Sequence, residues 1–257
     1  FGKKVILNYH TGEAETHLKN WRLTAQPTMK MFDKIVVPSQ FLIDVFARFD
    51  LKAEAVFNFV ESEKFKFRKR NPLELVFLSN RNFEAHYQVG DVLRAFRLIQ
   101  NKFPAARLIV AGYGSEESFL KKLAAELNLK NTEFVGRIEP AEMPKFYDQA
   151  DIYLNASVVD NMPLSIIEAF SCGLPVVSTD AGGIPYLCEN GETALLVAAK
   201  DYEALAREAI RLIEDNDLAQ KIIHTARQNC VKYSWANVRG EWLNIYRQSA
   251  SEKIQPR

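Results

Sequence analysis

Residues 160–185 read DNMPLSIIEAFSCGLPVVSTDAGGIP, which is a polar start, an apolar helical stretch and then a short apolar run. Asp160 or Asn161 suits the cap of a helix, and Pro163 suits its first position because the N–H that proline lacks needs no partner there. The helix that follows is apolar on almost all sides, which predicts a buried helix. Residues 175–179 (PVVST) then predict a buried strand. Such a pair is typical of a parallel α/β sheet.

The same alternation of strand and helix patterns continues on both sides of this stretch. Short apolar runs predict strands at residues 5–9, 34–37, 55–58, 75–78, 107–111, 133–135, 152–154, 175–179 and 194–197. Apolar residues at helical spacing predict helices over residues 41–46 (behind a Ser39 cap), 92–99, 116–127, 143–150 and 235–246. Because the strands are continuously apolar, we predict parallel sheets covered by helices on both faces.

One segment, residues 61–72, interrupts the alternation and concentrates basic side chains: Lys64, Lys66, Arg68, Lys69 and Arg70. It is either a solvated linker or a patch that contacts an anionic membrane or a phosphorylated acceptor. Both interpretations make it a domain boundary. Residues 1–60 hold about two and a half strand–helix units, too few for a complete doubly wound sheet. The residues after the boundary hold about six strands with their helices, which is enough for one.

The bulk composition excludes several classes of protein. Of the 257 residues, 47% are hydrophobic and 25% are charged, the ordinary balance of a globular protein. The formal net charge of +1 gives no reason to expect a nucleic-acid partner. Cys172, Cys188 and Cys230 form no CxxC pair, so they predict reduced thiols and not a metal site. No apolar run is long enough to span a membrane and no signal peptide is recognisable, so we expect a cytoplasmic protein.

The turn after the predicted strand 107–111 contains two glycines, Gly112 and Gly114. It superficially resembles a dinucleotide-binding turn, but Glu117 stands where the third glycine of that motif belongs. A nicotinamide site is therefore disfavoured. The glycines instead predict a tight turn with close approach of the backbone to a ligand or a neighbouring strand.

Glu168 lies in the predicted buried helix, where a carboxylate is costly unless it has a partner. Helical side chains lean toward the N-terminus, so Glu168 points to the end of the helix that Asp160 flanks. The free N–H groups of the first turn suit a phosphate, and the two carboxylates suit the hydroxyl groups of a sugar. The alternative is that Glu168 reaches solvent and Asp160 only caps the helix.

Several blocks of the chain resemble family 4 of the GT-B glycosyltransferases. Residues 160–168 are similar to the E-x7-E element of that family, and residues 168–185 to the block that follows it. Co-linear matches occur at residues 106–114, 134–138, 149–154, 190–197 and 233–235, so the resemblance covers roughly residues 73–247.

The resemblance implies a GT-B type α/β fold, with one complete Rossmann-like doubly wound domain and a partial second one. Residues 73–234 would be the C-terminal domain that binds a nucleotide-sugar. The other parts implied are a partial N-terminal, acceptor-side domain (1–60), a linker (61–72) and a C-terminal helix that crosses back to the N-terminal domain (235–250).

The resemblance also implies roles for single residues at the donor site. Glu168 would hold the ribose hydroxyls of the nucleotide. The backbone amides of Leu164 and Ser165, beside Pro163, would meet the diphosphate. Asp160 would stand by the hydroxyls of the transferred sugar.

Further donor contacts are implied for residues upstream of that helix: Arg81, Gly112, Gly114, Gly136 and Arg137. Of these, Arg81 resembles the phosphate-binding arginine of the family, and Gly136 and Arg137 lie where the base is usually held. His10 follows the predicted strand 5–9 as the active-site histidine of the family does. Its alternative is an ordinary loop histidine.

These matches imply a retaining glycosyltransferase that moves a hexosyl group from a UDP- or GDP-sugar to a glycan, a lipid-linked or a small-molecule acceptor. The charge that develops on the leaving diphosphate would be met by Arg81 and the helix N-terminus, so no metal or other cofactor is expected. Two alternatives are a nucleotide-sugar-binding relic that no longer transfers and a GT-B-fold sugar-nucleotide epimerase. The epimerase would be expected to place additional acidic and histidine residues in the cleft.

Three positions depart from the pattern of the family. Asp160 replaces the usual glutamate and is one methylene shorter. A lysine usually follows the arginine within a few residues, but none occurs after Arg81 until Lys102. Tyr186 stands where the Gly-Gly loop usually leads to a glutamate.

The start of the chain leads to one more expectation. Phe1 is not an initiator methionine and residues 1–60 are few for a doubly wound half, so we expect an N-terminally truncated form. The final helix would dock through Trp235, Trp242, Ile245 and Tyr246 onto a surface that is partly absent, which would expose apolar area and favour self-association. Such a chain would bind a nucleotide-sugar but transfer it slowly or not at all, because the positioning of the acceptor would be lost.

Overall fold

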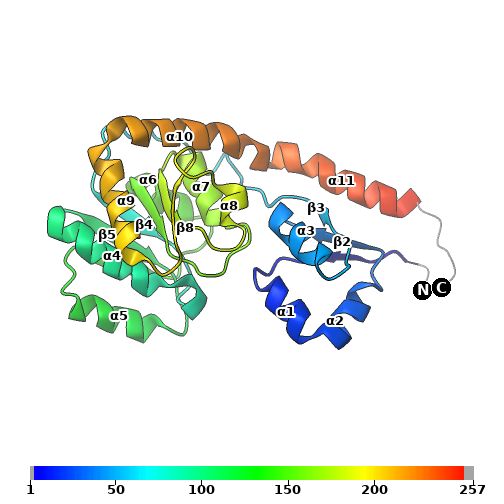
Figure 1. The fold of residues 1–257 in the computed structure, drawn as a ribbon. Helices are drawn as coiled ribbons and strands as arrows, with labels where there is room; N and C mark the ends of the chain where they lie inside the picture. Colours follow the sequence, from blue (N-terminus) through cyan, green and yellow to red (C-terminus); the bar gives the residue numbers. More distant parts are fainter. Residues whose placement is uncertain (1–2, 252–257) are drawn as a thin grey trace.

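The computed structural model describes residues 3–251, so Phe1 lies outside the described residues. The chain forms two parallel sheets with helices around them (Figure 1). The smaller sheet has the strand order β1-β2-β3, with β1 at Ile6–Asn8, β2 at Lys34–Val37 and β3 at Glu54–Ala55. The helices of this part are α1 (Ala14–Asn20), α2 (Arg22–Met29) and α3 (Gln40–Ala47).

The larger sheet has six strands in the order β6-β5-β4-β7-β8-β9, and all neighbouring pairs are parallel. The strands are β4 (Val76–Ser79), β5 (Arg107–Ala111), β6 (Thr132–Gly136), β7 (Ile152–Asn155), β8 (Val176–Thr179) and β9 (Leu195–Val197). The chain winds outward from β4 in one direction and then from β7 in the other. The boundary between β4 and β7 is therefore a topological switch point, where open α/β sheets bind their ligands.

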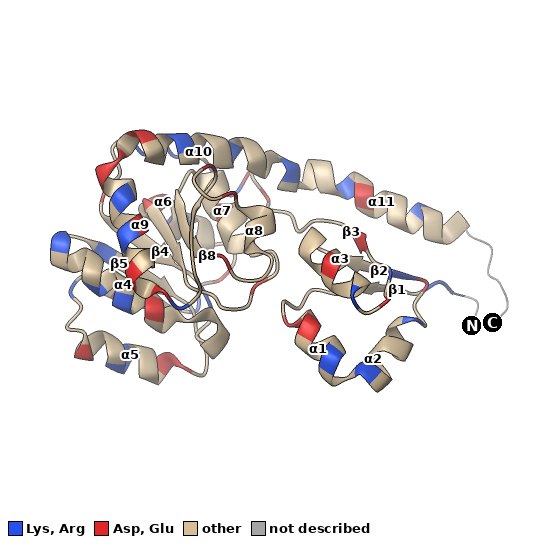
Figure 2. Ribbon diagram, in the orientation of Figure 1, with Lys and Arg blue, Asp and Glu red and all other residues tan. Residues whose placement is uncertain are grey.

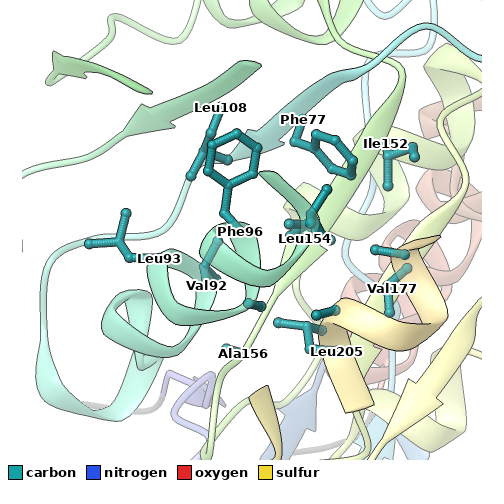
Figure 3. Close-up of a cluster of buried hydrophobic side chains, with 14 of the residues drawn as sticks. Phe77, Val92, Leu93, Phe96, Leu108, Ile152, Leu154, Ala156, Val177 and Leu205 are labelled. Atoms are coloured by element: carbon teal, nitrogen blue, oxygen red, sulfur yellow. The ribbon is translucent and has the colours of Figure 1, made fainter. Parts of the chain in front are cut away.

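Helices cover both faces of the larger sheet. They are α4 (Val89–Lys102), α5 (Glu117–Glu126), α6 (Met143–Gln149), α7 (Leu164–Cys172), α8 (Ile184–Leu187), α9 (Tyr202–Glu214) and α10 (Asn216–Cys230), with short 3-10 helices η1 (Ala85–Tyr87) and η2 (Val231–Tyr233). Phe77 packs with Phe96 of α4 and Leu205 of α9 on one face (Figure 3), whereas the next residue, Leu78, packs with Ile166 of α7 on the other. This alternation confirms the predicted parallel sheet covered on both faces.

Most elements lie close to their predicted positions, with boundaries that differ by up to three residues. Ser39 caps α3 as predicted, because its hydroxyl oxygen accepts the Leu42 N–H at 3.2 Å. The predicted strand 55–58 is wrong in extent, since β3 covers only Glu54–Ala55. The apolar spacing predicted no helix over α1, α2, α8, α9 or α10. Asp201 and Asp215, which cap α9 and α10, were usable signals for the last two.

The segment 61–72 is not simply a solvated linker, and two of its cations do not form an exposed patch. The Arg70 side chain is fully buried; its Nε donates to the Ala150 carbonyl at 2.8 Å and its Nη2 to the Tyr147 carbonyl at 2.7 Å. Arg68 pairs with Asp151 at 2.9 Å. Burial lowers the pKa of Arg70 to about 10, opposed by Asp151. Figure 2 shows cations and anions interspersed along the helices of both parts.

The last helix, α11 (Trp235–Ser251), leaves the larger sheet and lies along the smaller one (Figure 1). Val238 and Ile245 of this helix are buried against Val36 of β2 and against Val56. The prediction of Ile245 as an anchor is confirmed. Trp235 and Tyr246 are 47% and 56% exposed, so they are not buried anchors. The Trp235 ring instead packs on the Phe59 ring, with 4.8 Å between the centroids, and the Tyr246 ring stacks on the Trp242 ring at 5.8 Å.

The described part of the chain contains no helix that is long and apolar enough to cross a membrane. Cys172 and Cys188 are buried free thiols, and Cys230 is a partly buried one.

Candidate functional site

The residues at the switch point converge on one arginine. Arg81 follows β4, whereas Asp160 and Ser165 come from the loop after β7 and from the first turn of α7. The Arg81 guanidinium donates to Asp160 Oδ2 at 2.5 Å and to Ser165 Oγ at 3.1 Å. It also lies over the Tyr87 ring, with its Cζ 4.1 Å from the ring centroid. The geometry therefore joins a cation, a carboxylate and a helix N-terminus.

The Arg81 side chain is largely buried, with 11% of its surface exposed, so its pKa depends strongly on the charged groups around it. Burial lowers its pKa, but the Asp160 carboxylate and nearby tyrosines oppose this, and the net pKa of Arg81 is raised. Within residues 3–251 its Nε–H finds no acceptor. A buried cation with a spare donor is suited to bind an anionic ligand.

Helix α7 begins one residue later than predicted. Pro163 is the N-cap residue and not the first helical residue, and no side chain of the described chain caps this helix. The interpretation that Asp160 caps it is also wrong. The Oδ2 atom of Asp160 accepts a hydrogen bond from Arg81, and its Oδ1 accepts the Asn161 N–H at 2.9 Å. The N–H groups of the first turn, at Leu164 and Ser165, thus remain suited to an anion.

The Glu168 carboxylate, which lies in a mostly buried helix, has a hydrogen-bond partner in Tyr147. The Tyr147 hydroxyl donates to Glu168 Oε2 at 2.7 Å, and Asn80 Nδ2 donates to the same hydroxyl at 2.8 Å. Burial raises the pKa of Glu168, while the hydrogen bond from Tyr147 and the charge of Arg81 oppose the rise. The carboxylate is half-buried and lies at the wall of a cavity.

This pKa shift predicts that Glu168→Gln stabilises the ligand-free protein at neutral pH. The folded-state pKa lies above the unfolded value of about 4.3, so the stability linked to Glu168 is fully present below that pH and is lost as pH rises through the folded pKa. Glutamine stays neutral throughout and can still accept the Tyr147 hydroxyl.

Urea midpoints of both proteins between about pH 4 and pH 8 check this prediction. The stability difference in favour of the variant is expected to open as pH rises. A difference that is the same at every pH would contradict it.

Glu168 and Leu164 line a cavity of about 770 Å³. Other lining residues come from the loop after β6, from Met143 at the start of α6, and from residues 59–65, which include Lys64 of the basic cluster. Cavities of this size hold small organic ligands in proteins.

A second, smaller cavity of about 290 Å³ lies between the two sheets. His10, Tyr87, His86 and Asp160 belong to its lining. His10 Nε2 lies 2.9 Å from Asn8 Oδ1, and partial burial lowers the pKa of His10. The structure thus brings His10 and Asp160 to one cavity.

The loop after β7 also joins the two sheets. Asn161 hydrogen-bonds to the Ser39 hydroxyl and donates to the His10 carbonyl at 3.5 Å. A Cβ added to Gly12 would lie 3.1 Å from the Asp160 carbonyl carbon. The loops that follow β1 and β2 of the smaller sheet therefore contact the loop that carries Asp160 directly.

Tyr186, one of the three departures noted above, forms a further contact between the two parts. Its hydroxyl donates to Asp44 Oδ2 at 2.9 Å, and its ring lies 5.9 Å from the Phe41 ring.

Gly112 and Gly114 follow β5 and lie close to the backbone of Arg81 and Phe83. A Cβ on Gly112 would lie 2.2 Å from the Arg81 carbonyl oxygen, and one on Gly114 would lie 2.5 Å from the Phe83 carbonyl oxygen. Both residues have positive φ, at 151° and 156°. Their close backbone approach is to the segment after β4 that carries Arg81. Of the two partners predicted for this turn, a ligand or a neighbouring strand, the structure shows the second.

Gly136 and Arg137 lie at the end of β6. The Gly136 carbonyl accepts the Gly112 N–H at 2.9 Å. The Arg137 side chain is exposed and lies over the Tyr113 ring, 5.1 Å from its centroid. The next two residues, Ile138 and Glu139, line the larger cavity.

Sequence reasoning missed four side chains of this site: Asn80, His86, Tyr87 and Tyr147. Tyr147 was assigned to an apolar helical stripe, and periodicity does not reveal that its hydroxyl meets a carboxylate. Among residues 3–251, no group of three or more His, Cys, Asp or Glu side chains is arranged to hold a metal ion.

Comparison with known proteins adds independent evidence. The family model described as glycosyl transferases group 1 matches residues 60–229. The N-acetyl-alpha-D-glucosaminyl L-malate synthase of Bacillus anthracis is 26% identical over 211 residues, which are 78% of this chain and 51% of that protein. A sulfoquinovosyl transferase of Arabidopsis thaliana is 30% identical over 186 residues, 68% of this chain and 36% of that protein. The chain spans about half or less of the length of these curated relatives.

Two solved structures show the same fold. The sucrose-phosphate synthase of Thermosynechococcus elongatus superposes with a TM-score of 0.84 at 20% identity, over 95% of this chain and 67% of that one. HepE of Anabaena, solved in complex with UDP and glucose, has a TM-score of 0.82 at 19% identity, over 97% of this chain and 72% of that one. These likenesses confirm the GT-B type fold expected from the sequence.

Proposed function

Because this chain belongs to the family of glycosyl transferases group 1, we propose that it binds a nucleotide-sugar at the switch point of its larger sheet. Residues 73–234 would form the donor-binding domain, 61–72 the linker and 1–60 the acceptor side, with the helix over 235–250 joining the two. The reaction would be retaining transfer of a hexosyl group to a glycan, a lipid-linked or a small-molecule acceptor.

One observation carries this proposal. The Glu168 carboxylate lies at the wall of a cavity of about 770 Å³, in the same helix whose uncapped first turn meets Arg81. A nucleoside in that cavity would place its ribose at Glu168 and its diphosphate at the helix N-terminus and Arg81. A carboxylate accepts hydrogen bonds from ribose hydroxyls, and a helix N-terminus and an arginine donate hydrogen bonds to phosphate oxygens.

The chemistry follows from where charge develops. As the bond to the sugar breaks, negative charge grows on the leaving diphosphate and is stabilised by Arg81 and the N–H groups of Leu164 and Ser165. Asp160 and His10 stand at the neighbouring cavity, where the transferred sugar and the acceptor would meet. With these donors in place, no metal is required for the leaving group.

The first test is a panel of UDP-, GDP- and ADP-sugars in thermal unfolding, because a ligand that binds the folded state raises its stability. Glu168→Gln is then expected to weaken the best ribonucleotide by about tenfold or more, since a hydrogen bond to a charged group is lost. The 2′,3′-dideoxy form of the same nucleotide is the control, and its affinity is expected not to change. Equal affinities of both proteins for the ribonucleotide would refute the ribose assignment.

The two alternative functions, a binding relic and a sugar-nucleotide epimerase, differ from a transferase in what they do to the donor. A binding relic would bind a donor without transferring or hydrolysing it, and an epimerase would convert the sugar without releasing it. Product analysis with labelled donor, with and without acceptor, separates the three.

A further inference from the structure

We propose that Asp160 occupies, in the ligand-free protein, the place on Arg81 that the diphosphate of the donor takes. Binding of the diphosphate would displace the carboxylate and leave it free for the hydroxyls of the transferred sugar. The inference rests on the proposed function, in which Arg81 is the phosphate-binding cation.

The contacts of Arg81 leave little room for a ligand in the present arrangement. The side chains of Arg81 and Asp160 are 11% and 10% exposed, and their ion pair is 2.5 Å long. The Ser165 hydroxyl accepts a second N–H of the Arg81 guanidinium, and the Tyr87 ring covers one face of the guanidinium. An anion therefore cannot gain full access to Arg81 while Asp160 holds it.

Asp160 and Tyr87 both line the smaller cavity, and both contact Arg81. They stand between that cavity and the guanidinium. A diphosphate that approaches from this side meets the Asp160 carboxylate first, and like charges repel each other. From this cavity, the phosphate reaches the Arg81 guanidinium after the carboxylate has turned away.

The surrounding backbone permits this exchange without a rearrangement of the loop. The Gly183 N–H donates to the Asp160 carbonyl at 3.0 Å, and a Cβ on Gly182 would lie only 2.2 Å from the same carbonyl oxygen. The glycine pair thus fixes the Asp160 backbone, and we expect the carboxylate to leave Arg81 by rotation about its side-chain bonds, which also breaks its hydrogen bond from the Asn161 N–H. Arg81 keeps an anionic partner before and after the exchange, which avoids an unpaired buried charge.

Calorimetric titration with inorganic pyrophosphate tests the exchange without any nucleoside. Asp160→Asn is expected to bind pyrophosphate about tenfold more tightly than the wild type, which corresponds to a site that is blocked about 90% of the time. Asp180→Asn is the control, because it removes an exposed carboxylate that is not a partner of Arg81 and lines neither cavity; it is expected to leave pyrophosphate affinity unchanged. Asp160→Ser replaces the asparagine variant if circular dichroism shows that the latter does not fold.

A second measurement uses the wild-type chain. The side-chain carboxyl ¹³C signal of Asp160 is expected to shift as pyrophosphate saturates the site. An unchanged signal at saturation, or unchanged or weaker affinity in a folded Asp160 variant, would overturn the inference. If pyrophosphate behaves as expected but no nucleotide-sugar binds, the exchange stands and the proposed function fails.

Discussion

Arg81→Ala is expected to lower the affinity for UDP or GDP, whichever the protein binds, by about a hundredfold while changing the affinity for the matching nucleoside little. Arg81 is the buried cation at the switch point, it contacts the first turn of α7, and its Nε–H has no acceptor in the described chain. Charge-assisted hydrogen bonds to phosphate are roughly twice as strong as neutral ones. Titration calorimetry with the nucleoside diphosphate and the nucleoside measures both affinities.

Arg81→Ala also leaves the Asp160 carboxylate buried without its cation, so a loss of stability must be separated from a loss of binding. The double variant with Asp160→Asn removes both charges; it is expected to recover stability but not diphosphate binding. Arg207→Ala is the control, because that arginine is exposed on α9 and lines neither of the two cavities at the site. Equal losses for diphosphate and nucleoside in Arg81→Ala would show that the phosphate role is wrong.

Arg70→Met is expected to lower the free energy of unfolding by about 3–5 kcal/mol. Its guanidinium is fully buried and donates to the carbonyls of Ala150, Tyr147, Cys172 and Arg68, which methionine leaves without a partner. The residue ties the segment between the two sheets to the ends of α6 and α7. Urea denaturation followed by circular dichroism measures the loss.

Lys69→Met is the matched control for this prediction, because the neighbouring cation is exposed. It is expected to change stability by less than about 0.5 kcal/mol. Similar losses in the two variants would mean that the carbonyl network of Arg70 contributes nothing beyond an ordinary surface charge.

Short-range patterns in the sequence were sufficient for most of the elements and for part of the site. The alternation of apolar runs and helical stripes predicted the parallel sheets, and the hydroxyl of Ser39 was recognisable as a helix cap. The lone carboxylate in an apolar helix predicted that Glu168 has a partner or a ligand. Each of these features is determined by residues within a few positions of one another, where local geometry decides.

The tertiary structure alone decided which distant side chains meet. Arg81 and Asp160 are 79 positions apart, and they pair because β4 and β7 are neighbours in the sheet. Tyr147 reaches Glu168 because α6 packs against α7. Arg70 looked like part of a solvated basic cluster, and its burial depends on carbonyls of two separate segments, at the ends of α6 and α7. Strand order and helix docking result from packing of the whole chain, so local periodicity determines which groups are present and the completed fold determines their partners.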